Sequence, residues 1–308
     1  MIPAGSHGGD GARLAAALGI AAHQVLDLSA SLNPVAPDPT PIVRAHLDAV
    51  ARYPDADAAT DALARAMDVP AGSLLLTNGG AEAIALVAAE LGPGWVEEPD
   101  FSLYRRHLPG LDRDGPWWRS NPHNPTGLLA PATQAADVWD EAFWPLATGT
   151  WTRGDRHAGA VVLGSLTKLL ACPGLRAGYV LASAAMIGRL AGRQPKWAVN
   201  GLACAALPDL LATVDLASWA KETARLREQL VAVLQDNNLV PARSDANWVL
   251  VEAPALRPAL ARHGILVRDC ATFGLAGTVR IAVPGDDGLD RLADALRRLD
   301  REEPPCRA

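Results

Sequence analysis

The chain has 308 residues, of which 49% are hydrophobic and 20% are charged, and its formal net charge is −6 at pH 7. This composition is typical of a globular protein with a sizeable core, and the length allows one large domain and one small domain. The acidic balance gives no sign of a nucleic-acid-binding surface. No apolar run approaches the ~20 residues that a membrane helix needs. We therefore expect neither a nucleic acid nor a membrane as partner.

The four cysteines stand at positions 172, 204, 270 and 306 and form no CxxC pair. This spacing argues against a zinc site and against a disulfide framework, so we expect no metal. The first ten residues have no basic start and no apolar core, so they do not predict a signal peptide. The sequence thus predicts a cytoplasmic protein with reduced thiols.

In the first two thirds of the chain, short apolar runs alternate with helical patterns. An N-terminal arm leads into a helix over 11–18 and a strand over 25–28, and four prolines make 34–41 extended. Further helices are expected over 41–50, 58–67 and 81–91, and further strands over 74–77, 94–97, 117–120, 160–165 and 178–182. Such alternation indicates a parallel α/β sheet, whose ligands bind beyond the carboxyl ends of the strands.

The pattern changes after about residue 205. A long helix is expected over 216–236, and it is followed by a small α+β arrangement with strands over 247–252, 265–268 and 278–283 and helices over 254–263 and 288–299. The sequence therefore predicts an N-terminal arm that contributes to the small domain (1–30), a large domain (31–205) and a small C-terminal domain (206–308).

Four motifs at or near the predicted strand ends carry chemical groups. In chain order they are Asn-Pro-Thr-Gly at 124–127, Asp-Glu-Ala-Phe at 140–143, Ser-Leu-Thr-Lys at 165–168 and Pro-Gly-Leu-Arg at 173–176. Lys168 can form a Schiff base, Asp140 can pair with a ring nitrogen, and Asn124 can bond a ring oxygen. The groups that can bind a phosphate are Ser165, Thr167 and Arg176. Pyridoxal 5'-phosphate has all of these features.

Order, residue types and the Lys-to-Arg spacing resemble the fold-type I pyridoxal-phosphate enzymes of the aspartate-aminotransferase superfamily. Within it the chain is most similar to the branch of histidinol-phosphate aminotransferases and threonine-phosphate decarboxylases, from the His-Gly-Gly at 7–9 to Arg280. The resemblance implies a large domain with a mostly parallel sheet and helices on both faces, and a small α+β C-terminal domain. Read singly, each motif has an ordinary structural explanation, such as a helix N-cap for Asp140 or a turn for Gly79-Gly80.

The resemblance also implies roles on the cofactor. Lys168 would be the Schiff-base lysine, Asp140 would keep the ring nitrogen protonated, and Asn124 would hold the ring oxygen. Tyr104 would lie over the ring, although an aromatic residue packed in the core is an equal reading. The phosphate would be held by Gly80, Ala81, Ser165, Thr167 and Arg176, at a helix N-terminus. Tyr53 matches a tyrosine that the neighbouring subunit lends, which implies a homodimer with shared active sites.

On the substrate side, Arg280 matches the arginine that binds the substrate carboxylate, and Arg268 stands in a Val-Arg-Asp-Cys resembling a motif of the decarboxylase branch. Two guanidinium groups suit a small phosphorylated amino acid, which carries both a carboxylate and a phosphate. Asn33 is a candidate for contact with the same carboxylate, and His7 is a candidate for contact with the substrate phosphate.

The chain departs from the family at two places. Phe143 stands where most relatives carry a tyrosine, so the phenol hydrogen bond to the ring oxygen is lost. Only sixteen positions separate Asn124 from Asp140, where relatives usually carry a helix and a full strand. We expect a shortened crossover here, with a short helix and a strand at 138–139.

Three functions fit these residues. The first is decarboxylation of L-threonine O-3-phosphate to an aminopropanol phosphate for cobalamin biosynthesis, and the second is an aminotransferase acting on histidinol phosphate or a related amino acid. The third, a cofactor-binding module of a transcription regulator, is disfavoured by the intact lysine and by the lack of a helix-turn-helix extension. The first two share the same cofactor residues, because a small rotation of the substrate decides which bond breaks.

Overall fold

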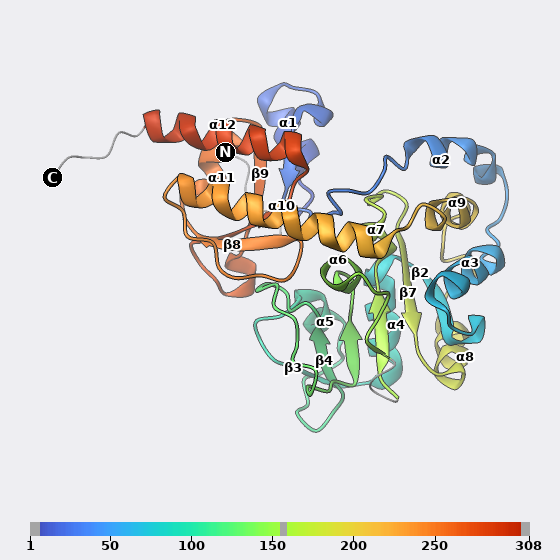
Figure 1. Ribbon diagram of the computed structural model, residues 1–308. Coiled ribbons are helices and arrows are strands. Elements are labelled where there is room, and N and C mark those ends of the chain that lie inside the picture. The colour runs from blue at the N-terminus through green and yellow to red at the C-terminus, as the bar shows by residue number, and fades with distance from the viewer. Residues whose placement is uncertain (1–6, 155–158, 303–308) are drawn as a thin grey trace.

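The computed structural model describes residues 7–154 and 159–302, so the start of the predicted arm and Cys306 lie outside the described residues. Two separate sheets organise the chain (Figure 1). The larger sheet has the order β2-β7-β6-β5-β4-β3. Its strands are β2 (Leu74–Asn78), β3 (Trp95–Val96), β4 (Trp117–Ser120), β5 (Val138–Asp140), β6 (Val161–Gly164) and β7 (Ala177–Leu181).

Strand β7 runs antiparallel to both of its neighbours, whereas β3, β4, β5 and β6 pair in parallel. The sheet is therefore mostly parallel, as the resemblance implied, and β7 is its antiparallel strand. Because β2 points the same way as β6, the carboxyl ends of β2, β4, β5 and β6 meet the beginning of β7 at one edge of the sheet. This edge carries the predicted motifs.

Helices cover both faces of the larger sheet. Two successive residues of β7 show that each face has its own core. Tyr179 belongs to one buried cluster, and Val180 belongs to another on the opposite face. The first cluster includes residues of α3 (Asp57–Met67), α7 (Leu166–Leu169) and α9 (Gly201–Leu211); the second includes residues of α4 (Gly79–Leu91), α5 (Ser102–His107) and α8 (Ala184–Arg193). The architecture is thus a sheet between two helical layers, as the resemblance implied.

The smaller sheet has the order β1-β9-β10-β8, with β1 (Leu26–Leu28) parallel to β9 (Ile265–Asp269) and β10 (Thr278–Ala282) antiparallel to β9 and β8 (Trp248–Glu252). The N-terminal strand therefore completes a sheet of C-terminal strands. The helices of this region are α1 (Gly11–Leu18), α10 (Leu216–Asp236), α11 (Leu256–Ala261) and α12 (Asp286–Glu302). The division at residues 30 and 205 stays a prediction.

Most predicted elements form within two residues of the expected bounds, and α1 and α10 form over the expected residues. The helix expected over 41–50 is interrupted at His46, which separates α2 (Thr40–Ala45) from the 3₁₀ segment η2 (Leu47–Ala51). Several described elements were not predicted from the sequence: the helices α5, α6 (Trp144–Thr148), α8 and α9, and the 3₁₀ segments Ala22–Gln24, Ala71–Ser73 and Ala271–Phe273.

The crossover from β4 to β5 contains no helix in residues 121–137, so the expected short helix is wrong. Buried Arg153 takes over part of the hydrogen bonding that a helix would have provided. Its guanidinium donates to the carbonyl oxygens of Ala130, Pro131, Ala132 and Gln134 at 3.0–3.5 Å and lies 4.7 Å from the ring centroid of Trp139. One side chain thus fixes the irregular backbone that leads to Asp140, because carbonyls removed from water need donors.

Within the described ranges, no single helix is long and apolar enough to cross a membrane; only α9 and α10 taken together, which are bent by 89° at their junction, meet the length and composition criteria.

Candidate active site

A cavity of about 310 Å³ lies at the edge of the larger sheet where the strand ends meet, and residues of the smaller sheet close its other side. Of the predicted residues, those on its wall are His7, Gly80, Ala81, Tyr104, Asn124, Asp140, Ser165, Thr167, Lys168, Arg176, Arg268 and Arg280. Residues separated by as many as 273 positions are thus brought to one place. Two predicted residues, Asn33 and Tyr53, do not line this cavity.

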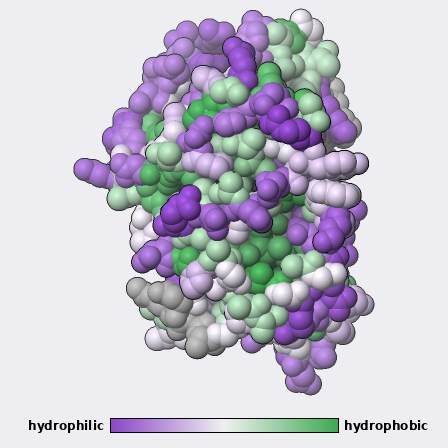
Figure 2. All heavy atoms as spheres, turned by 90° about the vertical axis from the view of Figure 1, so that its right-hand side faces the viewer, coloured by the Kyte–Doolittle hydropathy of each residue, from purple (hydrophilic) through white to green (hydrophobic). Residues whose placement is uncertain are grey.

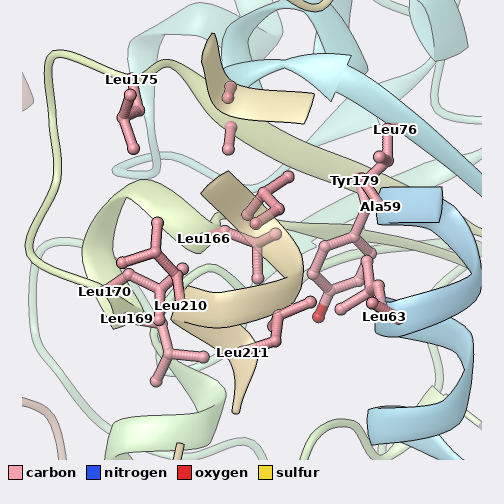
Figure 3. Packing of buried hydrophobic residues seen from close by; sticks show 14 of the residues in the cluster. Ala59, Leu63, Leu76, Leu166, Leu169, Leu170, Leu175, Tyr179, Leu210 and Leu211 are labelled. Carbon is pink, nitrogen blue, oxygen red and sulfur yellow. The ribbon is translucent and has the colours of Figure 1, made fainter. Parts of the chain in front are cut away.

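Lys168 stands on α7, the short helix that follows β6. Leu166, Leu169 and Leu170 fix this helix, because their side chains are buried in the cluster beside α9 (Figure 3). The opposite side of the helix carries Lys168 to the cavity wall, where its Nζ donates to the carbonyl oxygen of Ala30 at 2.9 Å. The buried leucines therefore set the position of the amine.

The environment of Lys168 lowers the pKa of its amine to about 8, mainly through burial and then through the positive charges of Arg280 and Arg176. A lysine with this pKa is partly neutral near physiological pH, so its nitrogen can act as a nucleophile or a base. This is the property that a Schiff-base lysine needs.

Asp140 ends β5 and lies on the cavity wall. Its Oδ2 accepts a hydrogen bond of 2.7 Å from the hydroxyl of Tyr104, and its Oδ1 accepts one of 3.0 Å from the backbone of Ala142. Burial raises the pKa of Asp140, while these two hydrogen bonds oppose the rise. Tyr104 therefore has a second contact that the sequence did not suggest, in addition to a ring that lines the cavity.

The predicted phosphate cup forms where α4 begins. Gly79 has a positive φ of 74°, which favours glycine, and a Cβ built on it would lie 2.4 Å from a terminal nitrogen of Arg176, so a side chain here would displace this guanidinium. Arg176 itself has a φ of 55°, which a non-glycine residue adopts mainly where the surrounding structure requires it. Gly80, Ala81 and Ser165 line the same end of the cavity, whereas the hydroxyl of Thr167 donates to the carbonyl oxygen of Ala177 at 3.2 Å.

Asn124 and Arg280 join the two sheets inside the cavity. The Oδ1 of Asn124 accepts a hydrogen bond of 2.7 Å from a guanidinium nitrogen of Arg280, and both side chains are buried. The backbone of Asn124 donates to Ser120 Oγ at 2.7 Å, and Ser120 Oγ donates to Asp100. Burial lowers the pKa of Arg280 to about 10, and Arg268 adds to this effect. A negatively charged group bound here would relieve this unfavourable burial of positive charge.

Arg268 and His7 form the remaining part of this wall. Arg268 is buried, donates to Thr272 Oγ1 at 2.8 Å and stands 5.8 Å from the ring centroid of Phe273. The ring of His7 contacts Phe101 edge to face, with 5.9 Å between centroids. Partial burial lowers the pKa of His7, as do Arg268 and Arg106, so this end of the cavity carries positive potential.

Asn33 lies behind Lys168 and makes no approach to the cavity. Its side chain donates to the carbonyl oxygen of Leu169 at 2.9 Å and accepts from the backbone of Val35 at 3.0 Å. Both ends of the amide are thus engaged in holding α7. Tyr53 is 79% exposed and stacks on Trp197, with 4.5 Å between ring centroids. Within one chain the structure gives neither residue a place in the cavity.

Sequence reasoning missed three buried residues that support the site: Trp248, Ser120 and Asp100. Burial raises the pKa of Asp100 to about 7, although Ser120 donates to it twice. Asp100 directly follows the Glu98-Pro99 pair before α5, a place where a turn is an adequate explanation. No local pattern marked these residues, because the contacts between Asp100 and Ser120 and between Trp248 and Pro125 join positions 20 or more apart in the chain.

Comparison with known proteins agrees with this geometry. The family "Aminotransferase class I and II" matches residues 118–296. A threonine-phosphate decarboxylase from Salmonella typhimurium is 34% identical over 355 aligned positions, and the alignment covers 96% of each chain. A histidinol-phosphate aminotransferase from Symbiobacterium thermophilum is 29% identical, and the alignment covers 89% of this chain and 90% of that enzyme. The histidinol-phosphate aminotransferase structure from Clostridium acetobutylicum superposes with a TM-score of 0.77 at 20% identity, covering 91% of this chain and 100% of its own. The chain belongs to the aminotransferase class I and II family, whose members depend on pyridoxal 5'-phosphate.

The alignment with the Salmonella relative spans more positions than the 308 residues of this chain, so the relative carries segments that are absent here. The residues of the cavity nevertheless fit the family's cofactor. A lysine with a lowered pKa, a carboxylate at a strand end and a cup formed by a helix start and Arg176 all face one cavity. The glycine-dependent approach of Arg176 to the start of α4 is the feature that most directly suits the cofactor's phosphate.

Proposed function

We propose that the protein decarboxylates L-threonine O-3-phosphate to an aminopropanol phosphate for cobalamin biosynthesis. The observation that carries the proposal is the wall formed by Arg268, Arg280 and His7, because it offers two buried guanidinium groups and an imidazole to one small ligand. A substrate with a carboxylate and a phosphate matches this set. The similarity to the Salmonella threonine-phosphate decarboxylase supports the same choice.

Each residue then has a chemical task. When bound, pyridoxal 5'-phosphate supplies an electron sink for the substrate. Asp140 would pair with the ring nitrogen and keep that nitrogen protonated, and Lys168 would hold the cofactor until the substrate amine takes its place. Lys168 then delivers a proton to the substrate carbon from which carbon dioxide has left, a task suited to an amine with a pKa of about 8. The gained proton replaces the lost carboxylate, so charge and atoms balance.

The substrate is oriented by the positive wall. Arg280 binds the carboxylate, and Arg268 with His7 binds the phosphate. The residues that would hold the cofactor phosphate are those of the separate cup, Gly80, Ala81, Ser165 and Arg176. Because the two phosphates are held at different ends of the cavity, neither site competes with the other.

The test is to incubate the cofactor-loaded enzyme with L-threonine O-3-phosphate, in the absence of any keto acid, and to measure carbon dioxide. We expect one carbon dioxide for each aminopropanol phosphate formed, over many turnovers. Turnover that stops after one equivalent and resumes only when a keto acid is added would contradict the proposal. The same result would support the second candidate, an aminotransferase, which the similarity to the Symbiobacterium enzyme favours.

We also propose that the protein is a cytoplasmic homodimer whose subunits share active sites. Large apolar side chains, including Leu47, Val50, Tyr53 and Trp197, are exposed on one side of the molecule. Figure 2 shows apolar patches interrupting the polar surface on the side where α2, α3, α8 and α9 lie. Patches of this kind suit a subunit interface, and Tyr53 would reach the cofactor phosphate of the partner from there. The described cysteines carry free thiols, which suits a reducing compartment.

Mixing two inactive variants tests the shared site. Tyr53→Ala and Lys168→Ala proteins damage different parts of the site, so a mixed dimer with subunit exchange contains one intact site. In a C2 dimer with random exchange, about a quarter of the wild-type activity is expected. Demonstrated exchange of subunits without any recovered activity would show that each site is built from one chain.

A further inference from the structure

Trp248 connects three parts of the cavity, although it does not itself line it. It belongs to β8, it is fully buried, and its indole N–H donates to the carbonyl oxygen of Pro125 at 2.8 Å. The guanidinium carbon of Arg280 stands 4.9 Å from the centroid of the indole ring. Phe143 meets the indole edge to face, with 4.7 Å between centroids and 74° between planes.

Through these contacts the indole of Trp248 connects the surroundings of Lys168 with Arg280. Phe143 lies 6.0 Å from Nζ of Lys168, and Arg280 bonds Asn124, the residue before Pro125. One ring thus packs against the residue beside the amine, the loop that carries Asn124 and the arginine assigned to the carboxylate. Any displacement of the indole would move all three.

The support of Arg280 is unusual for a buried cation. Among the described residues it forms no ion pair with a carboxylate, and its Nε has no hydrogen-bond partner. Its guanidinium contacts the Asn124 oxygen through one terminal nitrogen and lies against the face of Trp248. A guanidinium is a flat, rigid fork, so the surface on which it lies sets the direction in which its remaining donors point.

We propose that Trp248 is a positioning residue, which fixes the plane of the Arg280 guanidinium and thereby the rotation of the substrate carboxylate. The proposal rests on the proposed role of Arg280 in carboxylate binding. The bond that breaks is the one held perpendicular to the cofactor ring, so the angle of the carboxylate decides between loss of carbon dioxide and loss of a proton. Trp248 therefore acts on reaction choice through Arg280, without touching the substrate.

A matched pair of unreactive ligands isolates the carboxylate. 3-Phosphoglycerate and glycerol 3-phosphate both carry a phosphate, but only the first carries a carboxylate. Binding of each to the cofactor-loaded enzyme is measured by calorimetry for wild type, Trp248→Phe and Trp219→Phe. Trp219 is the control, because it is a tryptophan buried in the core beside α9, and it does not line the cavity.

We expect Trp248→Phe to weaken 3-phosphoglycerate roughly three- to tenfold, the size of a lost guanidinium–indole contact, and to leave glycerol 3-phosphate within about twofold of wild type. Trp219→Phe should change neither. Equal weakening of both ligands by Trp248→Phe, or the same selective effect from Trp219→Phe, would overturn the proposal, since either outcome indicates a general structural role. If Trp248→Phe protein does not fold, Trp248→Tyr is measured against the same expectations.

The second readout is the ratio of carbon dioxide released to pyridoxamine phosphate formed from L-threonine O-3-phosphate. Trp248→Phe should change this ratio at least severalfold, and an unchanged ratio would contradict the role in reaction choice. The two proposals fail in different ways. If wild type proves to transaminate, the proposed function fails, while selective weakening of 3-phosphoglycerate would still uphold the role of Trp248. If Arg280→Gln leaves 3-phosphoglycerate binding unchanged, the assignment of Arg280 fails instead.

Discussion

The two walls of the cavity are built in different ways. The cofactor wall takes Asp140, Lys168 and the start of α4 from the carboxyl ends of β5, β6 and β2, all in one sheet. The substrate wall takes His7 from the N-terminal arm and Arg268 and Arg280 from two strands of the other sheet. The first wall is fixed within one rigid layer, whereas the second depends on how the smaller sheet meets the larger one. Cofactor binding and substrate orientation should therefore respond to different substitutions.

The largest effect is expected from Lys168→Ala, which removes the amine from the cofactor wall. Turnover should fall at least about a thousandfold, while cofactor still binds non-covalently through the cup and Asp140. Reduction of the wild-type enzyme with borohydride, followed by peptide mapping, should place the label on Lys168. A label on another lysine would remove the assignment, and loss of all cofactor binding in the variant would show that the cup alone is too weak.

The next effect tests the substrate wall alone. Arg280→Gln should raise KM for L-threonine O-3-phosphate roughly a hundredfold, because two charge-assisted hydrogen bonds are lost. The absorbance of the bound cofactor should be retained, since Arg280 belongs to the other wall. Arg225→Gln is the control, because Arg225 forms exposed ion pairs with Glu222 and Asp286. Loss of cofactor in Arg280→Gln would show that the two walls are not separable.

This difference also explains what could be predicted from the sequence. Lys168, Asp140 and Arg176 follow or precede apolar strands at recognisable spacing, so their convergence follows from the rule that strand ends of an α/β sheet meet at one edge. The antiparallel direction of strand β7 could not be predicted, because an apolar run of five residues does not indicate which way a strand runs. The helix predicted between Asn124 and Asp140 does not form. Backbone carbonyls of this segment accept hydrogen bonds from Arg153 instead, a residue distant in the chain.

The substrate wall was predicted only in part. Its charged residues were visible through resemblance, but the supports that hold them were not. Trp248 reads as an ordinary core residue of a strand, and its contacts to Arg280, Phe143 and Pro125 depend on the meeting of two sheets. For Asn33 the sequence motif suggested contact with the substrate. In the structure its amide instead donates to the carbonyl oxygen of Leu169 and holds α7. Long-range packing of this kind has no local pattern in the sequence.

The pKa of Lys168 predicts a smaller, graded effect on the cofactor wall. Burial and neighbouring cations lower this pKa to about 8, and only the neutral amine attacks an aldehyde. The rate at which apoenzyme captures pyridoxal 5'-phosphate should therefore rise about tenfold per pH unit below about pH 8 and level off above it. Stopped-flow absorbance across pH 6–11, with the cofactor's own titration subtracted, gives the profile. A rate that keeps rising to pH 10 would mean that the amine has an ordinary pKa.

The smallest expected effect concerns Phe143, which lies where the walls meet. The centroid of its ring is 6.0 Å from Nζ of Lys168, and the ring packs on Trp248. The resemblance implies that a tyrosine at this position would reach the cofactor's ring oxygen. Such a hydroxyl would stabilise the ionised ring oxygen, which would then depend less on the proton at the Lys168–cofactor linkage. Phe143 cannot donate, so wild-type enzyme should keep that proton to higher pH than the Phe143→Tyr variant.

We expect Phe143→Tyr to lower the pKa of the linkage proton by about one unit, the size of a single hydrogen bond to a charged group. The pH-dependent absorbance of the bound cofactor reports this pKa directly, without turnover. Phe273→Tyr serves as the control, because Phe273 also lines the cavity but packs on Arg268 of the substrate wall. Equal titration of wild type and Phe143→Tyr would mean that Asn124 already dominates at the ring oxygen, or that residue 143 does not reach it.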